Sequence, residues 1–284
     1  MNTTIEKLPQ VIVVGAAGGI GKKILTQLKS RAKVIAIVQN YEQRLEVTQF
    51  TDQCFECDLS NIESVEKTLF SITENTPSGI NGLIFCAAMQ PVNPLELHDR
   101  RALEQLFSIN LFGTLQIIQG LLPKIRETKG RIVLFSSMAG RVAAPMLGGY
   151  SASKFALEAS ADVLRRELAP SGITVSLIEP GGVDTPMAGA QSALVEKLLE
   201  TLDSIQESNY GRLIRGYGNM AKAALRHAST PEAVARVAVN ALLTTSRPKA
   251  RYLVGIDAKL MILLSRILPT HWLDSLLVRA IIGK

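Results

Sequence analysis

One stretch of the chain carries side chains that could hold and move a proton. Tyr150 and Lys154 stand four residues apart in a segment with helical periodicity, and Ser137 lies at the end of a strand-like run that begins at Ile132. Positions four apart share one helix face, so the phenol and the ammonium should be neighbours. An adjacent fixed cation would lower the tyrosine pKa from ~10 by stabilising the phenolate. Tyr150 is therefore a candidate general acid or base, and Ser137 a candidate to hold a carbonyl or alcohol oxygen.

The first element that must position these groups is a glycine-rich turn near the amino terminus. It follows the apolar run 11–14, precedes a helical pattern, and contains Gly15, Gly18, Gly19, Ile20 and Gly21. Strand, glycine turn and helix in this order are typical of a dinucleotide-binding unit, because glycine lets the backbone approach a pyrophosphate that the helix amino terminus attracts. A glycine cluster alone is often only a tight turn, but the flanking pattern favours the cofactor site.

The end of the second strand-like run bears on the choice of cofactor. The run 34–38 ends at Gln39 and Asn40, about 20 residues past the last glycine, where an acidic residue would bind the adenosine ribose. No acid stands there, which removes an obstacle to a 2′-phosphate. We therefore expect NADP in preference to NAD, although no arginine occupies the position either. Three basic residues lie close in the sequence: Lys22, Lys23 and Arg44.

A third strand-like run, 53–57, ends at two further candidate cofactor residues, Asp58 and Leu59. The Asp58 carboxylate is a candidate to bind the adenine amino group. In the alternative interpretation Asp58 only decorates the turn into the next helix, which Ser60 and Glu63 would open as a capping box.

A fourth run, 83–86, leads into Ala87 and Ala88, whose small side chains would permit close approach of a cofactor. Two helical patterns follow, one on each side of Asn110. An asparagine inside an apolar helix is disfavoured unless its side chain has a role. A functional role is one interpretation of Asn110, and a buried asparagine with satisfied hydrogen bonds is the other.

A rigid turn after the sixth run, 173–178, should lie at the same edge of the sheet as Ser137. Ligands of such sheets bind at the carboxyl ends of the strands, so this turn is expected to contribute to the cofactor site. Its candidate residues are Pro180, Gly181, Val183 and Thr185. After a further segment, Thr230 and Pro231 should begin a helix as its cap and first residue.

The segment of about 187–228 is expected to cover the substrate as a lid. An amphipathic helix is predicted over 190–205, followed by a turn at 208–211. The loop before Tyr150 is apolar, with no charge after Arg141, and pocket linings of this kind favour bulky apolar substrates. The candidate substrate residues are Ser137, Met138, Ala144, Met146, Leu147, Tyr150 and Met187.

The chain of 284 residues has no repeat or linker and favours one catalytic domain, over 8–257, with an apolar helical tail over 258–284. The tail suits two amphipathic helices and lacks the ~20 uninterrupted apolar residues that span a bilayer. Packing on the body of the protein, on a partner subunit and on a membrane face all remain open for it. Peripheral membrane contact is favoured by basic residues that flank the apolar stripes.

Charge and cysteine content exclude several classes of function. The net charge is +6, but the basic residues are dispersed, which argues against nucleic-acid binding. The three cysteines lie in strand-like runs and are expected to be core thiols, and the three scattered histidines have no metal-ligand spacing. The first ten residues lack the apolar core of a signal peptide, so a cytoplasmic location is expected, with membrane association through the tail as an addition.

Taken together, the strand–helix repeats, the glycine turn and the candidate proton-handling residues resemble the short-chain dehydrogenase/reductase family, in its compact single-domain branch. The resemblance covers about 11–255. It is strongest to the retinol and hydroxysteroid dehydrogenase group, through YSASKFALE, VSLIEPGGVDTP and RYLVGIDAKL. It implies an α/β fold with a doubly wound parallel sheet, a Rossmann fold in three α/β/α layers.

The resemblance also implies roles for individual residues. The residues that match the family's catalytic tetrad are Asn110, Ser137, Tyr150 and Lys154. Lys154 would also hold the nicotinamide ribose, Asn110 would anchor a water in a proton relay, and Thr185 would bind the carboxamide. Matches to the family's cofactor glycines and adenine-binding acid are Gly15, Gly19, Gly21 and Asp58.

Two stretches depart from the family pattern. Val14 stands where a threonine is usual, and Phe85 to Ala88 replace Asn-Asn-Ala-Gly. The side chains that are lost mostly tie strands together, so local hydrogen bonding and cofactor affinity are in question. The tetrad is untouched.

The sequence therefore predicts an NAD(P)-dependent alcohol dehydrogenase or ketone reductase for a lipophilic retinoid-, steroid- or fatty-type substrate, working as a homodimer or homotetramer. A non-catalytic cofactor-binding redox sensor or scaffold is the main alternative. An epimerase or dehydratase would use the same Tyr and Lys pair, but it generally needs a larger carboxyl-terminal domain than the residues after Pro180 provide.

Overall fold

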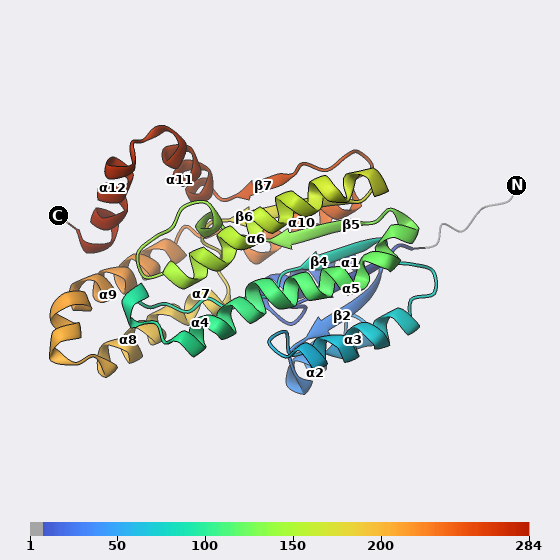
Figure 1. Cartoon of the computed structure of the whole chain (residues 1–284), viewed down its shortest axis with the longest axis horizontal. Helices are drawn as coiled ribbons and strands as arrows, with labels where there is room; N and C mark the ends of the chain where they lie inside the picture. Colours follow the sequence, from blue (N-terminus) through green and yellow to red (C-terminus); the bar gives the residue numbers. More distant parts are fainter. Residues whose placement is uncertain (1–7, 284) are drawn as a thin grey trace, which may run out of the picture.

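A computed structural model describes residues 8–283 as three layers around one parallel sheet of seven strands (Figure 1). The strand order is β3-β2-β1-β4-β5-β6-β7, and it reverses between β1 and β4, which confirms the predicted doubly wound Rossmann-type sheet. The strands are β1 (Gln10–Val14), β2 (Lys33–Val38), β3 (Gln53–Glu56), β4 (Gly82–Phe85), β5 (Arg131–Phe135), β6 (Thr174–Pro180) and β7 (Arg251–Val254).

Two parts of the sequence-based expectations lie outside the described residues. The prediction about a signal peptide was made from the first ten residues, of which 1–7 are not described, and the tail prediction includes Lys284.

Helices cover both faces of the sheet, because the central strands are apolar on both sides and must bury both. One face packs against α1 (Gly19–Leu28), α2 (Tyr41–Val47) and α10 (Pro231–Leu243). The other face packs against α3 (Ile62–Glu74), α5 (Gly113–Thr128) and α6 (Gly148–Glu167). The predicted start of α10 is confirmed, since the Thr230 side chain caps the helix and Pro231 is its first residue.

The two helical patterns around Asn110 form one continuous helix. It consists of α4 (Arg100–Phe107), a π-helical segment (Ser108–Phe112) and α5. By length and composition alone, the 29 residues Arg100–Thr128 are the one described helix that could cross a membrane. Its apolar window is 44% buried within the fold, where α5 packs on the sheet, and core helices of soluble proteins pass the same test.

The lid segment forms three helices beyond the carboxyl edge of the sheet: α7 (Pro186–Gly189), α8 (Gln191–Thr201) and α9 (Ser204–Leu225) (Figure 1). The predicted turn at 208–211 is wrong, because these residues lie inside α9. The chain turns earlier, at Asp203, whose carboxylate accepts hydrogen bonds from the backbone of Ile205 and Gln206 while the Gln206 side chain bonds back to the Asp203 N–H. This capping box starts α9 before the polar residues that suggested a turn.

The carboxyl-terminal residues form the two predicted amphipathic helices, α11 (Ile256–Ile267) and α12 (Thr270–Ile282). The end of α12 joins a third, smaller core with the lid helices, in which Ile281 packs with Val195 of α8 and Ile214 of α9. The tail is thus partly an element of the lid. Its outer side keeps large apolar side chains exposed: Ile256, Leu260, Leu263, Ile267, Trp272, Leu276 and Val278.

Short turns of 3₁₀ helix complete the described structure, at Leu95–Leu97, Met138–Gly140 and Ala169–Ser171.

Candidate active site

The glycine turn and the end of β4 form a backbone cradle at the point where the strand order reverses. Gly15 has a φ of +80°, and a Cβ there would lie 2.6 Å from the backbone nitrogen of Ala87. A Cβ on Gly21 would overlap the carbonyl oxygen of Gly15. Only glycine fits at positions 15 and 21. These close approaches place the predicted cofactor glycines beside Ala87, and Gly18 caps the amino end of α1. A cradle of bare backbone facing a helix amino terminus fits a nicotinamide dinucleotide.

The turn after β6 closes against the same cradle. A Cβ on Gly19 would lie 3.0 Å from Cδ of Pro186 and 3.2 Å from Cγ2 of Thr185. The Thr185 hydroxyl accepts a hydrogen bond from the Ala188 N–H at 3.3 Å and so caps α7. The predicted cofactor residue Thr185 therefore stands beside the glycine turn.

The other predicted cofactor residues of these two turns make strand or core contacts. Pro180 ends β6, and the Gly181 N–H donates to the Val254 carbonyl of β7 at 2.9 Å. Val183 is buried in the core beneath the turn, and Ile20 packs half-buried against that same core. Ala88 is half-buried next to the cradle.

At the adenosine end of the predicted site, the polar and basic residues already have partners within the protein. Asn40 caps α2 by accepting a hydrogen bond from the Gln43 N–H at 3.0 Å, and the Gln39 N–H donates to the Gln43 side chain. The nearby cations are paired, Lys22 with Glu46 at 2.5 Å, Lys23 with Glu232 at 2.5 Å and Arg44 with Glu56 at 3.5 Å.

Asp58 makes contacts within its own turn, as expected if the residue only shapes the entry into the next helix. Its carboxylate accepts from the backbone and the hydroxyl of Ser60, at 2.9 and 2.7 Å. The predicted capping box of Ser60 and Glu63 is wrong, because Asn61 caps α3 by accepting from the Ser64 N–H at 2.7 Å. Asp58 remains exposed, and Leu59 is half-buried next to it.

The stretch that departs from the family pattern still ties β4 to β1. The Cys86 thiol lies 3.1 Å from the Val14 carbonyl oxygen, within hydrogen-bonding distance for sulfur. Burial raises the pKa of this thiol to about 12, so it is a neutral donor at neutral pH. A link between the strands is therefore present without the amide side chain.

Tyr150 and Lys154 lie one turn apart near the start of α6, and both side chains are buried. The Lys154 ammonium nitrogen is 5.8 Å from the centroid of the tyrosine ring and donates a hydrogen bond to the Phe135 carbonyl at 2.8 Å. Ser137 follows β5, and its hydroxyl accepts from the Ala139 N–H at 3.1 Å. The structure thus brings the three residues of the predicted proton-handling group together at the carboxyl edge of the sheet.

The predicted lowering of the Tyr150 pKa is wrong. Burial raises the pKa of Tyr150 to about 12 and outweighs the opposing hydrogen bond of Ser137. Burial also lowers the pKa of Lys154 to about 8, so the cation itself is destabilised. The sequence argument counted the charge of the lysine and omitted the loss of water around both groups.

Asn110 lies in the π-helical segment, and its side chain is fully engaged. The amide accepts from the Met89 N–H at 2.9 Å, and donates to the Met89 carbonyl at 2.9 Å and to the Ser153 hydroxyl at 3.1 Å. Ser153 in turn donates to the Tyr150 carbonyl at 2.7 Å. Asn110 therefore joins the loop after β4 to the helix of Tyr150. The wider turn of a π-helix, which recurs at functional sites, aims the amide at that loop.

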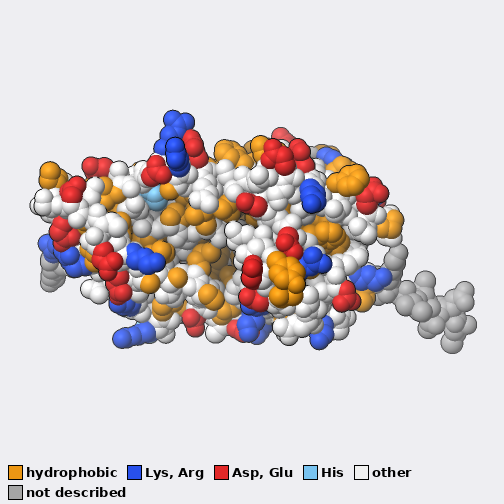
Figure 2. Space-filling view, turned by 90° about the horizontal axis from the view of Figure 1, so that it is seen from below, with side chains coloured by type: hydrophobic (Ala, Val, Ile, Leu, Met, Phe, Trp, Pro, Cys, Tyr) orange, Lys and Arg blue, Asp and Glu red, His pale blue; other side chains and the backbone are white. Residues whose placement is uncertain are grey.

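Two of the predicted substrate residues, Met146 and Leu147, belong to the third core. Met146 is buried in this core and has a φ of +72°, and Leu147 packs beside it. Met138 and Ala144 are half-buried, and Met187 is exposed on α7. Figure 2 shows a hollow with hydrophobic side chains in it, between α8 on the left and α2 on the right.

Sequence reasoning missed a polar chain that enters this apolar region from the lid. The buried Tyr217 hydroxyl of α9 donates to the Gln191 side chain at 3.1 Å, and Gln191 donates to the Gln90 side chain at 3.1 Å. Burial, with a contribution from Tyr150, raises the pKa of Tyr217. These hydrogen bonds link α8 and α9 of the lid to the loop after β4. No periodicity marks these residues, because their partners are far apart in the sequence.

The chain belongs to the short chain dehydrogenase family, whose family model matches residues 9–195. It is an NAD(P)-dependent oxidoreductase of that family, and the resemblance drawn from its motifs is confirmed.

Among its relatives, an uncharacterized oxidoreductase, YbbO, of Escherichia coli is 32% identical over 94% of this chain and 93% of that protein. The type 6 17-beta-hydroxysteroid dehydrogenase of Rattus norvegicus is 31% identical over 94% of this chain and 87% of that protein. A solved short chain dehydrogenase from Burkholderia cenocepacia, in complex with NADP, is similar with a TM-score of 0.70, at 23% identity and 98% coverage of both chains.

Proposed function

We propose that the protein transfers a hydride between NADP and a lipophilic alcohol or ketone, with Tyr150 as the general acid or base. The observation that carries this proposal is the convergence of Ser137, Tyr150 and Lys154 beside the glycine cradle, with Asn110 bracing the helix of Tyr150. A bound nicotinamide supplies or accepts the hydride. The residues of the chain hold the substrate oxygen and exchange its proton.

The buried tyrosine is suited to giving a proton. With a pKa of about 12, the Tyr150 hydroxyl stays protonated at neutral pH and can donate to a carbonyl oxygen that Ser137 also holds. Lys154 would take the ribose of the cofactor, and its ammonium is held in place by the hydrogen bond to the Phe135 carbonyl at the end of β5. Asn110 would position α6 and the loop after β4, and Thr185 would bind the carboxamide from the turn after β6.

The lipophilic character of the substrate is inferred from the third core. Met146 and Leu147 pack in this core with apolar side chains of α8 and α9, and Tyr217 of the same core is close enough to Tyr150 for the two phenols to interact electrostatically. Apolar linings with few polar groups select apolar ligands. The names of two relatives, a hydroxysteroid dehydrogenase and retinol dehydrogenase 16 of Homo sapiens, are consistent with this choice.

NADP is proposed over NAD because Gln39 and Asn40 present no carboxylate at the ribose position. Arg44, the cation nearest in sequence, is paired with Glu56, and both side chains are exposed. Exposed pairs are worth only ~0–1 kcal/mol, so a 2′-phosphate can compete for the guanidinium. Calorimetric titration should show tighter binding of NADP, and Arg44→Ala should weaken NADP while leaving NAD unchanged. A clear preference for NAD in the unmodified protein would contradict the proposal.

The decisive assay is a panel of retinoid, steroid and fatty ketones and alcohols, each tested with both cofactors in both directions. We expect turnover with bulky apolar substrates and little with short polar ones. If the protein binds NADP and turns over none of the panel, the alternative of a non-catalytic redox sensor or scaffold is favoured.

Homo-oligomerisation in the cytoplasm is part of the same proposal. Three large apolar side chains are exposed, one at the end of the π-helical segment and two on α6, and a second copy of the chain would cover them: Phe112, Phe155 and Val163. Sedimentation of the wild type and of Phe112→Ser tests this: an oligomer that the substitution dissociates supports the assignment, and a monomeric wild type contradicts it.

A further inference from the structure

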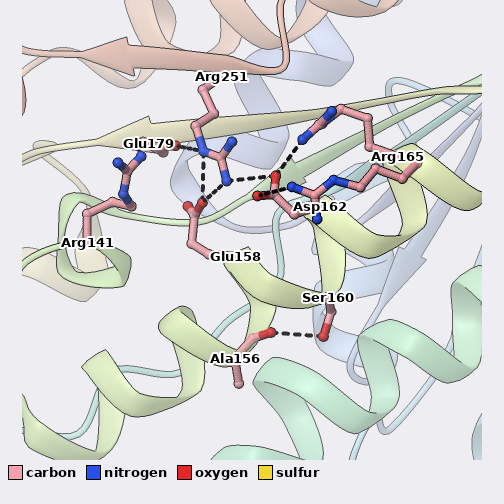
Figure 3. A network of polar contacts seen from close by, with 9 residues as sticks. Arg141, Ala156, Glu158, Ser160, Asp162, Arg165, Glu179 and Arg251 are labelled. Atoms are coloured by element: carbon pink, nitrogen blue, oxygen red, sulfur yellow. Dashed lines mark hydrogen bonds and ion pairs between the residues drawn. The ribbon is translucent and has the colours of Figure 1, made fainter.

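A partly buried cluster of charged side chains lies where α6 meets β6 and β7 (Figure 3). We call it the Glu179 cluster, and it comprises Arg141, Glu158, Asp162, Glu179 and Arg251. Its members come from four places in the fold, namely the end of the Ser137 turn, α6, β6 and β7. Arg251 lies at the centre. Its guanidinium is 3.0 Å from Glu179, 3.1 Å from Glu158 and 2.9 Å from Asp162.

Glu179 is the most enclosed member of the cluster, with none of its side chain exposed. Arg251 faces it from β7 and Arg141 from the Ser137 turn, at 3.0 and 3.5 Å, and Arg266 of α11 acts on it electrostatically. Glu158 of α6 is the like charge beside it. Burial and the repulsion of Glu158 raise the pKa of Glu179 to about 7, against the opposing effect of the three arginines. Neither carboxylate oxygen makes a hydrogen bond of good geometry within the described residues.

The cluster is attached to the candidate active site at two points. Arg141 closes the turn that begins at Ser137, where its N–H donates to the Met138 carbonyl at 3.0 Å. Glu158 stands one turn after Lys154 on α6 and acts on it electrostatically. The turn itself lies directly on α6, since a Cβ on Gly140 would lie 3.2 Å from the Lys154 carbonyl.

We propose that Glu179 and Arg251 are positioning residues, which hold the Ser137 turn against the Lys154 helix through Arg141 and Glu158. The inference rests on the proposed function, because it assigns the support of the proposed catalytic groups. Arg251 lies beyond residues 9–195, so the central member of the cluster stands outside the part of the chain that the family model matches.

The support depends on the charge of Glu179. Above pH 7 the carboxylate anchors both Arg141 and Arg251, and below pH 7 the neutral acid leaves Arg141 without its only ion-pair partner among the described residues. The Ser137 turn is therefore held more firmly as the pH rises through 7. Lys154 ionises nearby, near pH 8, so its titration must be separated from that of Glu179.

The first test follows the turn itself by NMR. In protein with ¹³C-methyl methionine, the Met138 signal should shift with a midpoint near pH 7. Glu179→Gln should abolish that step, because an amide does not titrate. Asp162→Asn is the matched control: it also removes an acid beside Arg251, but at the half-exposed outer end of the cluster, and it should keep the step. Arg251→Lys retracts the nearest cation and should move the midpoint to higher pH.

The second test uses turnover between about pH 5 and about pH 9. Wild type and Asp162→Asn should gain kcat through pH 7, whereas Glu179→Gln should stay roughly tenfold lower with no step near pH 7, within the loss of up to ~10²-fold that a misplacement of about 1 Å can cause. A Met138 step that persists in Glu179→Gln, or that is absent from the wild type, overturns the proposal. If the step behaves as expected but no substrate turns over, the positioning network stands and the proposed function fails.

Discussion

Replacing Ile281 by alanine should release α12 from the lid. Ile281 is the only buried side chain of α12, and it packs with Val195 and Ile214 in the third core. Two contacts to the backbone of α12 also hold this end of the helix on α9. A Cβ on Gly216 would overlap the Ile281 carbonyl oxygen, and the Arg212 side chain donates a hydrogen bond to the Ile282 carbonyl at 3.1 Å. Truncating a buried isoleucine to alanine costs about 2–5 kcal/mol. Ile282 packs half-buried against the same core and most other side chains of α12 are exposed, so the docking of the helix depends mainly on this end.

Hydrogen exchange measures this release directly. If α12 opens as its own unit, a loss of about 2 kcal/mol at the lower limit raises the exchange rate of its amides roughly 30-fold, at about 1.4 kcal/mol per factor of ten. The amides of α9 that face Ile281 should exchange faster as well, while those of β1 and β4 should not change. Leu276→Ala is the matched control on the same helix, because that side chain is 38% exposed.

Two results would refute this reasoning. Unchanged exchange of α12 in Ile281→Ala would show that the helix is held by other contacts. An equal acceleration in Leu276→Ala would show that α12 responds to any apolar loss, and that the third core has no special part in docking it.

Three further predictions test other parts of the structure. Gly21→Ala should weaken NADP binding at least tenfold in calorimetry, because its Cβ would overlap the Gly15 carbonyl, and unchanged affinity would refute the cradle. Met146→Gly should relieve a strained φ of +72° worth about 1 kcal/mol, but it should lose more from removing a buried side chain. The Tm should therefore fall in thermal unfolding, and a rise in Tm would contradict this balance. Leu260→Ser with Leu263→Ser should abolish flotation with anionic liposomes if α11 meets a membrane, and a wild type that does not float would disprove that contact.

The sequence was most informative where local pattern and sheet topology coincide. Gly15, Thr185 and Ser137 are far apart in the chain, but each follows an apolar run, and parallel strands bring such ends to one edge. Thr230 and Pro231 were recognisable as a helix start because the signal is contained in adjacent residues.

Features that depend on burial or distant partners were not predictable from pattern. The start of α9 at Asp203 was missed because a glycine and polar residues at 208–211 outweighed a capping box a few residues earlier. The pKa of Tyr150 was predicted in the wrong direction, since the depth of burial is not visible in the spacing of Tyr and Lys. Arg251 and Glu179 meet only after the sheet has formed, so nothing local marks their pairing.

The claim that Tyr150 moves the proton is tested most directly by the rate of hydride transfer in a single turnover of Tyr150→Phe with an active ketone from the panel. The substitution keeps the buried ring and removes the hydroxyl, so folding and NADP affinity should be retained while the rate falls by about 10²–10⁴-fold. Tyr252→Phe on β7 is the matched control, since its hydroxyl accepts a hydrogen bond from the Lys249 N–H just before that strand and contacts none of the proposed catalytic residues, so its rate should equal that of the wild type. A rate for Tyr150→Phe close to that of the control would contradict the assignment of Tyr150.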